Sequence, residues 1–102
     1  MNIHQKQKVE ELKIEFIKKV ESLITSGSAR ESFLNVYQDK NQHVYVMLNY
    51  PYDIDDYYRL RWTIEWYYIS QDGNIKQVNY SSSYIENSDK LEQYTYSYFS
   101  NE

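Results

Sequence analysis

The spacing of apolar residues changes once along the chain, near residue 30, and this change limits the possible folds more than any other feature. In residues 5–26 apolar side chains recur at steps of three and four, which places them on one face of an α-helix. The members of this stripe are Val9, Leu12, Phe16, Val20, Leu23 and Ile24. From residue 32 the period becomes two, which is typical of a strand with one buried face. We therefore predict an N-terminal amphipathic helix followed by β-strands.

About four strands follow from the alternation and the turn residues. Residues 33–38 and 42–50 alternate β-branched or aromatic residues with polar ones, and the polar stretch 39–41 between them predicts a hairpin turn. Pro51 is expected to end the second strand, because proline cannot donate a ladder hydrogen bond. Residues 59–68 form the clearest strand. An Asp-Gly turn at 72–73 then leads into a further strand within 75–82.

The strand at 59–68 has one strongly apolar face and one mixed face. We expect the apolar face to pack against the helix; its side chains are Trp62, Ile64 and Trp66. The opposite side of the sheet would then be an aromatic, half-polar surface that needs a cover or a partner. The side chains expected to point away from the helix are Arg59, Arg61, Tyr67, Tyr45 and Met47.

The C-terminal part of the chain is compatible with two structures. As a strand, it places Tyr94, Tyr96 and Tyr98 on one face; as a helix beginning near residue 87, it forms a stripe that includes Leu91. Polar side chains at 87–89 could cap a helix, which slightly favours the helix. The predicted fold class is α+β: an N-terminal amphipathic helix packed on one face of an antiparallel meander of about four strands, with a short C-terminal helix or strand.

Length and residue types exclude most catalytic classes. The 102 residues make one domain, 1–102, with a single core. The absence of cysteine excludes disulfides and thiol chemistry, and two glycines cannot build a phosphate-binding loop. The two histidines, His4 and His43, lie in no catalytic motif, and an enzyme would need His43 beside a carboxylate in a cleft. We expect no enzymatic activity, no cofactor and no bound metal.

The segment 50–61, YPYDIDDYYRLR, is the most unusual in the chain. Its aspartates have the first spacing of a calcium loop, but the glycine and glutamate that such a loop needs are missing. Tyrosine and arginine are enriched at binding hot spots, so the segment predicts a protein-binding surface; an acidic loop whose tyrosines pack at the edge of the core is the alternative. The candidate protein-binding residues are Asp53, Asp55, Asp56, Tyr57, Tyr58, Arg59, Arg61 and Tyr67.

The charge distribution bears on the kind of partner. Of the net charge of −4, residues 1–30 contribute +2 and the rest −6. An acidic sheet region is unsuited to binding phosphates directly, but it suits the basic groove of a protein that itself binds nucleic acid. Such a partner could be blocked by competition for its groove or by locking of a moving domain. We expect no direct contact with nucleic acid.

In size, acidity and lack of cysteine the chain resembles the small proteins with which phages and plasmids inhibit host defence enzymes, anti-CRISPR proteins among them. The resemblance implies a non-enzymatic inhibitor that binds a host protein which handles nucleic acid. A nuclease is one such target. Residues with AT-rich codons, such as Tyr, Ile, Lys and Asn, predominate, which favours a low-GC bacterial host. There are two alternatives: an immunity protein that neutralises a cognate toxin, and a homodimeric structural or regulatory protein. The first residues contain no continuous apolar run, so neither a signal peptide nor a membrane span is expected. We therefore expect the chain to be cytoplasmic and not bound to a membrane.

Overall fold

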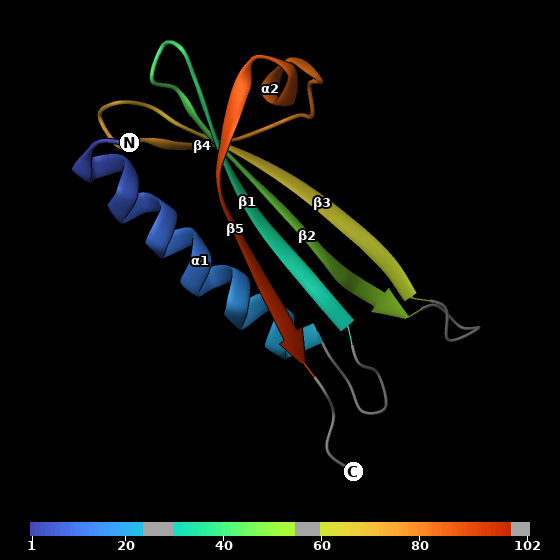
Figure 1. The fold of residues 1–102 in the computed structure, drawn as a ribbon. Coiled ribbons are helices and arrows are strands. Elements are labelled where there is room, and N and C mark those ends of the chain that lie inside the picture. The colour runs from blue at the N-terminus through green and yellow to red at the C-terminus, as the bar shows by residue number, and fades with distance from the viewer. Residues whose placement is uncertain (24–29, 55–59, 99–102) are drawn as a thin grey trace.

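The computed structural model describes residues 1–23, 30–54 and 60–98, with the backbone alone at 23, 30, 51–54, 60, 61 and 98. It contains two helices and five strands within these ranges (Figure 1). In chain order they are α1 (Ile3–Leu23), β1 (Arg30–Asp39), β2 (Val44–Ile54), β3 (Leu60–Ile69), β4 (Ile75–Val78), α2 (Ser83–Glu86) and β5 (Ser88–Tyr98). The predicted helix and hairpins are confirmed, while residues 24–26 of the predicted helix lie outside the described residues.

The strands form one antiparallel sheet in the order β4-β3-β2-β1-β5. β1 to β4 are a meander, and β5 returns to the far edge and pairs with β1. α1 lies across one face of this sheet, over β1 and β2, while α2 lies at one end, away from α1 (Figure 1). The α+β class and the helix-on-meander architecture are therefore confirmed. None of the helices in the described part of the chain combines the length and the apolar character that crossing a membrane requires.

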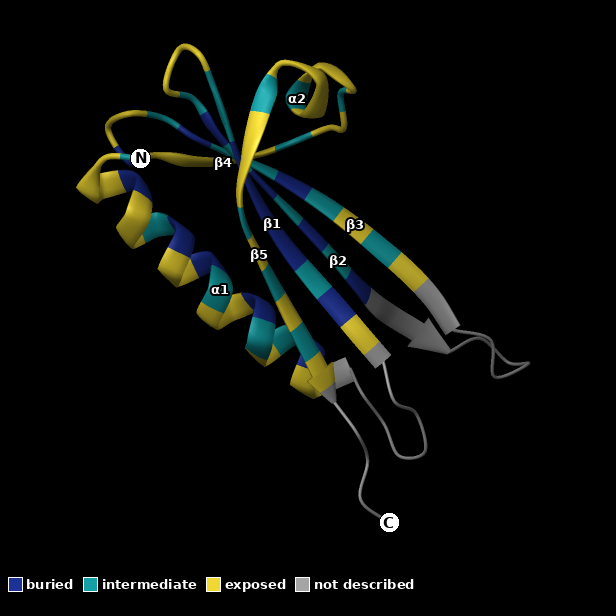
Figure 2. Cartoon of the chain, viewed as in Figure 1, coloured by how far each residue is buried: buried dark blue, intermediate teal, exposed yellow. Residues whose placement is uncertain are grey.

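The core lies between α1 and the sheet. Four residues of the predicted helical stripe are buried against it, and α1 shows its exposed side to solvent (Figure 2). Alternate residues of β1 and β2, together with Ile69 of β3, form the opposite wall, because successive strand residues point to opposite faces. The core residues are Val9, Leu12, Phe16, Val20, Leu34, Val36, Val44, Val46, Leu48, Tyr50 and Ile69.

The orientation predicted for β3 is wrong. Val46, which is buried under α1, pairs directly with Tyr67, so Tyr67 is on the face of the sheet that α1 covers. Trp66 pairs with Met47 and therefore points away from α1, together with Trp62 and Ile64. Because α1 covers β1 and β2, the α1 side of β3 lies at the margin of the core. There Glu65 forms an ion pair with Lys19 of α1, at 3.1 Å between Nζ and Oε2.

β2 continues through Pro51 to Ile54, so the prediction that the strand ends at this proline is also wrong. β2 pairs with β1 from Val44 to Asn49, but with β3 as far as Ile54. The hydrogen bond from the Asp39 N–H to the His43 carbonyl sets the alternation of the strand, which places the Pro51 nitrogen on the β1 side. Pro51 lies past the stretch paired with β1, so its missing donor breaks no ladder bond.

The C-terminal element is a strand, and the preference for a helix at 88–99 is not borne out. β5 pairs with β1 along its whole length, with one bulge between Val36 and Tyr37. This pairing gives hydrogen-bond partners to the N–H and C=O groups of β1 that point away from β2. A helix at 88–98 would have left those groups without partners in the sheet. It also brings Tyr94 to the core, where its ring meets Phe16 edge-on at 6.3 Å between centroids. The capping residue Asn87 instead ends α2.

Candidate protein-binding surface

The structure describes few side chains of the predicted binding segment. Residues 55–59, and with them Asp55, Asp56, Tyr57, Tyr58 and Arg59, lie outside the described residues. Asp53 and Arg61 are opposite each other in the backbone pairing of β2 with β3.

Tyr67 is the one predicted site residue whose side chain is described. It is half-buried on the α1 face, and its hydroxyl donates to the Glu65 carboxylate at 3.3 Å. Burial, followed by the neighbouring Glu65 charge, raises the pKa of the Tyr67 phenol. Tyr67 therefore belongs to the margin of the core and not to the surface that faces away from α1.

Aromatic residues gather instead on the face of the sheet opposite α1, which we call the aromatic face. Trp66 is at its centre and is only 2% exposed. Its ring is 5.8 Å from Tyr37, 5.9 Å from Tyr80 and 5.5 Å from Tyr84, measured between centroids. The other members on the strands are Tyr45, Met47, Trp62, Ile64 and Tyr68, and Ile85 joins them from α2.

α2 covers one part of the aromatic face. Tyr84 stacks on Tyr45 with 4.4 Å between ring centroids and 17° between planes. Tyr45 in turn contacts Tyr68, and Tyr68 contacts His43. Burial, and secondarily the nearby Asp39 charge, raises the pKa of the Tyr45 phenol. The chain between β4 and β5 is thus held on the sheet by stacked rings.

The rest of the aromatic face is open. Trp62 is 49% exposed and Ile64 58%, and beside them Tyr80 is 63% exposed. An open hollow of about 530 Å³ lies beside Ile64 and Tyr80 (Figure 2 shows the exposed positions along β3). Its apolar lining consists of Met47, Ile64, Trp66, Val78, Tyr80 and Ile85. Contiguous apolar residues on a small domain are typical of an interaction site.

Three buried polar atoms on the aromatic face have no hydrogen-bond partner among the described residues. They are Nε1 of Trp66 and the side-chain oxygens of Asn35 and Asn49. Each unsatisfied buried group costs roughly 1–3 kcal/mol of stability. The aromatic face thus buries polar groups together with its rings.

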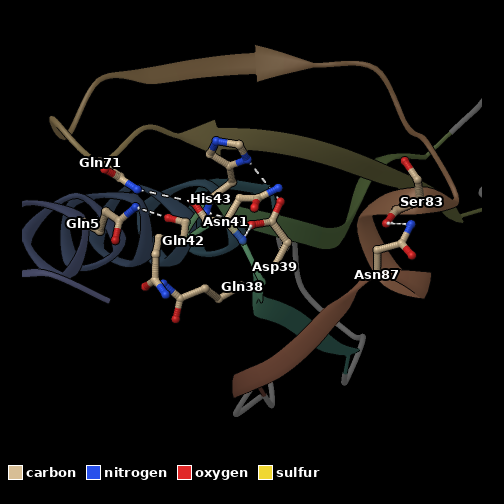
Figure 3. A network of polar contacts seen from close by, with 9 residues as sticks. All are labelled: Gln5, Gln38, Asp39, Asn41, Gln42, His43, Gln71, Ser83 and Asn87. Atoms are coloured by element: carbon tan, nitrogen blue, oxygen red, sulfur yellow. Dashed lines mark hydrogen bonds and ion pairs between the residues drawn. The ribbon is translucent and has the colours of Figure 1, made fainter.

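A polar network at the β1–β2 turn is structural (Figure 3). Asp39 accepts the backbone N–H groups of Asn41 and His43, both at 2.9 Å, and its second oxygen lies 3.1 Å from His43 Nδ1. Gln42 has a positive φ of 67°, and its carbonyl accepts a hydrogen bond from the buried Gln5 of α1 at 2.8 Å. The carboxylate that catalysis would require beside His43 is thus present, but it holds the turn. A hollow of about 380 Å³ beside this turn is lined by Asp39 and not by His43.

Among the described residues, no three His, Asp or Glu side chains lie close enough together to hold a metal ion. The comparisons do not supply a site either. No protein-family model, no curated protein and no solved structure matches this chain. The functional argument therefore rests on the geometry of the aromatic face.

The sequence pattern predicted an aromatic face away from α1 and included Tyr45 and Met47 in it, but it assigned the wrong side of β3 to that face. Alternation along β3 correctly grouped Trp62, Ile64 and Trp66 on one side. It could not show which side α1 covers. Tyr80 and Ile85 lie outside the predicted site, and no periodic signal marks them, because they belong to the crossover between β4 and β5.

Proposed function

We propose that this chain is a non-enzymatic, cytoplasmic inhibitor, phage- or plasmid-encoded, that binds a nucleic-acid-handling host defence protein. The observation that carries the proposal is the open part of the aromatic face, where Trp62, Ile64 and Tyr80 are exposed and an apolar hollow lies beside Ile64 and Tyr80. Large rigid rings bury much area with little loss of side-chain entropy, and they dominate binding energies in protein interfaces.

The charge of the chain supports the class of target. Residues 31–102, which include nearly all of the sheet, carry a net charge of −6, against +2 for residues 1–30. An acidic partner is attracted to the basic surface of a nucleic-acid-binding protein and repelled by nucleic acid itself. We therefore expect the inhibitor to bind the defence protein and not the nucleic acid on which that protein acts.

The test is a cleavage assay with purified RNA-guided and restriction nucleases from low-GC bacteria. The test variant is Tyr80→Ser with Ile85→Ser on the aromatic face; the control is Ile14→Ser, an exposed apolar residue on α1. We expect the wild type and the control to inhibit one nuclease at equal molar ratio, and the test variant to lose about tenfold in potency, as truncation of hot-spot residues does. Equal potency of the test variant, or no inhibited nuclease, would contradict the proposal.

The same assay tests the three aspartates of the segment 50–61. Replacement of Asp53, Asp55 and Asp56 by Ala is expected to abolish inhibition while the melting temperature stays near that of the wild type. Groove competition further predicts that inhibition weakens as salt is raised, because screening reduces attraction between exposed charges. Full inhibition by the triple variant would assign the binding energy to the aromatic face alone.

A further inference from the structure

β3 has an open edge along half of its length. β4 pairs with β3 only from Trp66 to Ile69, and it ends at Val78 opposite Trp66. Within the described ranges no strand pairs with Leu60–Glu65 on that side. This open stretch of six residues is about 20 Å long at about 3.3 Å per residue. We call it the β3 edge.

The hydrogen-bonding groups on the β3 edge can be assigned. Ser70 N donates to the Asn74 carbonyl at 3.0 Å, which fixes that backbone position as facing β4. Alternate residues face the same way in a regular strand, so the N–H and C=O groups of Trp62 and Ile64 also point to the open side. Their side chains lie on the aromatic face and are about half exposed. Among the described residues, the β3 edge therefore has backbone donors and acceptors that no strand pairs with, beside exposed apolar side chains.

The opposite edge of the sheet is built differently. β5 has charged residues at three positions, Asp89, Lys90 and Glu92, and its pairing with β1 contains a bulge. Charges and bulges are the features that protect sheet edges from unwanted strand addition. The β3 edge has charged residues only near its two ends, Arg61 and Glu65, and the register shift in its pairing with β2 lies opposite Arg61 and Trp62, so the stretch Trp62–Ile64 contains no charge. The contrast singles out the β3 edge as the side of the sheet open to another strand.

We propose that the β3 edge binds an extended segment of the partner protein as an added antiparallel strand in line with β4. This inference rests on the proposed function, because it specifies how the partner is held. The added strand has apolar side chains at alternate positions, opposite Trp62 and Ile64. The one opposite Ile64 reaches the hollow lined by Met47, Val78 and Tyr80. Addition of a strand to an open edge is a recurring mode of peptide recognition.

Charge determines the side chains between the apolar ones. Glu65 on the α1 side of the β3 edge is already paired with Lys19. Residues 31–102, which include Arg61 of the β3 edge, carry a net charge of −6, so this region as a whole attracts cationic segments. The intervening residues of the added strand are therefore lysine or arginine, in agreement with a basic target.

A second copy of the chain fits this edge poorly. Each copy has β4 on the same edge of β3, so a two-fold pairing that keeps the aromatic faces on one side would align only Leu60–Ile64 of each copy. A pairing with greater overlap would place the β4 of one copy on Leu60 of the other. Such a pairing uses only five of the six residues of each open stretch, whereas a free strand can pair with all of Leu60–Glu65. The structure therefore favours a single strand from a different protein.

The test uses a labelled, end-blocked peptide of alternating valine and lysine, Lys-Val-Lys-Val-Lys-Val-Lys, with binding to the full chain measured by fluorescence anisotropy. In the proposed register the valine N–H groups face β3 and the lysine N–H groups face solvent. N-methylation of the valines is expected to weaken binding at least about tenfold, the equivalent of one lost hydrogen bond, and N-methylation of the lysines to leave it nearly unchanged.

Variants of the chain test the edge from the other side. Ile64→Pro removes an N–H that faces the open edge and breaks no bond to β2, so circular dichroism should show an intact fold. It is expected to weaken peptide binding at least about tenfold, while Ile64→Val, which keeps the N–H, stays within about twofold.

Three outcomes would overturn the proposal. These are no binding of the unmodified peptide, equal binding of both methylated peptides, or full binding by Ile64→Pro. A dimer that sedimentation detects without peptide, and that Ile64→Pro dissociates, would also overturn it, because the occupant would then be a second copy. Each of these outcomes is independent of nuclease inhibition by the aromatic face, so the two proposals fail separately.

Discussion

Tyr84 of α2 stacks on Tyr45 of β2 with 4.4 Å between ring centroids, and this contact ties the crossover between β4 and β5 to the sheet. The same tyrosine meets Trp66 at 5.5 Å. α2 has only four residues and no buried ones, so a helix of this length has little stability of its own. Its position therefore depends on the ring contacts of Tyr84.

Replacement of Tyr84 tests this dependence. We expect Tyr84→Ala to lower the free energy of unfolding by about 2 kcal/mol, the value of a largely packed aromatic side chain. Tyr84→Phe keeps the ring and should change the free energy of unfolding by less than about 0.5 kcal/mol. Urea unfolding and near-ultraviolet circular dichroism measure both effects. An unchanged stability in Tyr84→Ala would show that α2 is held by other contacts.

The ion pair between Lys13 of α1 and Glu92 of β5 predicts a pH-dependent contribution. Its Nζ and Oε1 atoms are 2.8 Å apart, and the hydrogen bond to Glu92 raises the pKa of Lys13 against the opposing effect of burial. Because the raised pKa belongs to a cation, the contribution is complete below the unfolded value of 10.5 and is lost as pH rises through the folded value.

Glu92→Gln should therefore lower the free energy of unfolding at neutral pH by about 0.5–1 kcal/mol, because the pair is partly exposed. The difference from the wild type should vanish above the folded pKa of Lys13. Glu10→Gln is the matched control, since Glu10 contacts the same ammonium from an exposed position. A difference that persists at high pH would assign the effect to packing.

Three tyrosines predict a loss of stability in alkali. Burial raises the pKa of the phenols of Tyr45, Tyr50 and Tyr67 above 10.0. The unfolded chain ionises these groups first, so the stability is complete below about pH 10 and falls as the pH rises through their folded pKa values. Phenolate absorbance should show these groups titrating late and together with unfolding. Tyr67→Phe should reduce the slope of stability against pH in this range.

Gly73 in the turn between β3 and β4 has a φ of +85°, and an added Cβ would lie 3.1 Å from the Cβ of His4. Gly73→Ala is expected to lower the free energy of unfolding by about 1–3 kcal/mol, because both backbone strain and a tight contact oppose the new methyl group. The double variant with His4→Gly separates the two terms in thermal unfolding. Complete rescue by His4→Gly would assign the loss to the contact and not to the backbone.

Much of the fold could be predicted from local pattern. The helical stripe, the two hairpins and the strand with alternating Trp62, Ile64 and Trp66 all follow from periods of 3.6 and 2. The candidate surface was predicted as aromatic and facing away from α1, with Tyr45 and Met47 as correct members. Tyr80 and Ile85 had to come from the structure, because they reach it through a crossover that no local signal reports.

The sequence by itself determined the elements that carry one unambiguous period, which are α1 and β1 to β4, because a side chain's direction within a helix or strand depends on local backbone geometry. Only the tertiary structure decided the rest. The segment 88–98 fits both periods, and the open edge of β1 selected the strand. The side of β3 that faces α1 was likewise decided by its pairing with β2, which sets Tyr67 beside the buried Val46 and puts Trp62 and Ile64 on the opposite face. These choices depend on contacts between residues far apart in the chain, which a local pattern does not contain.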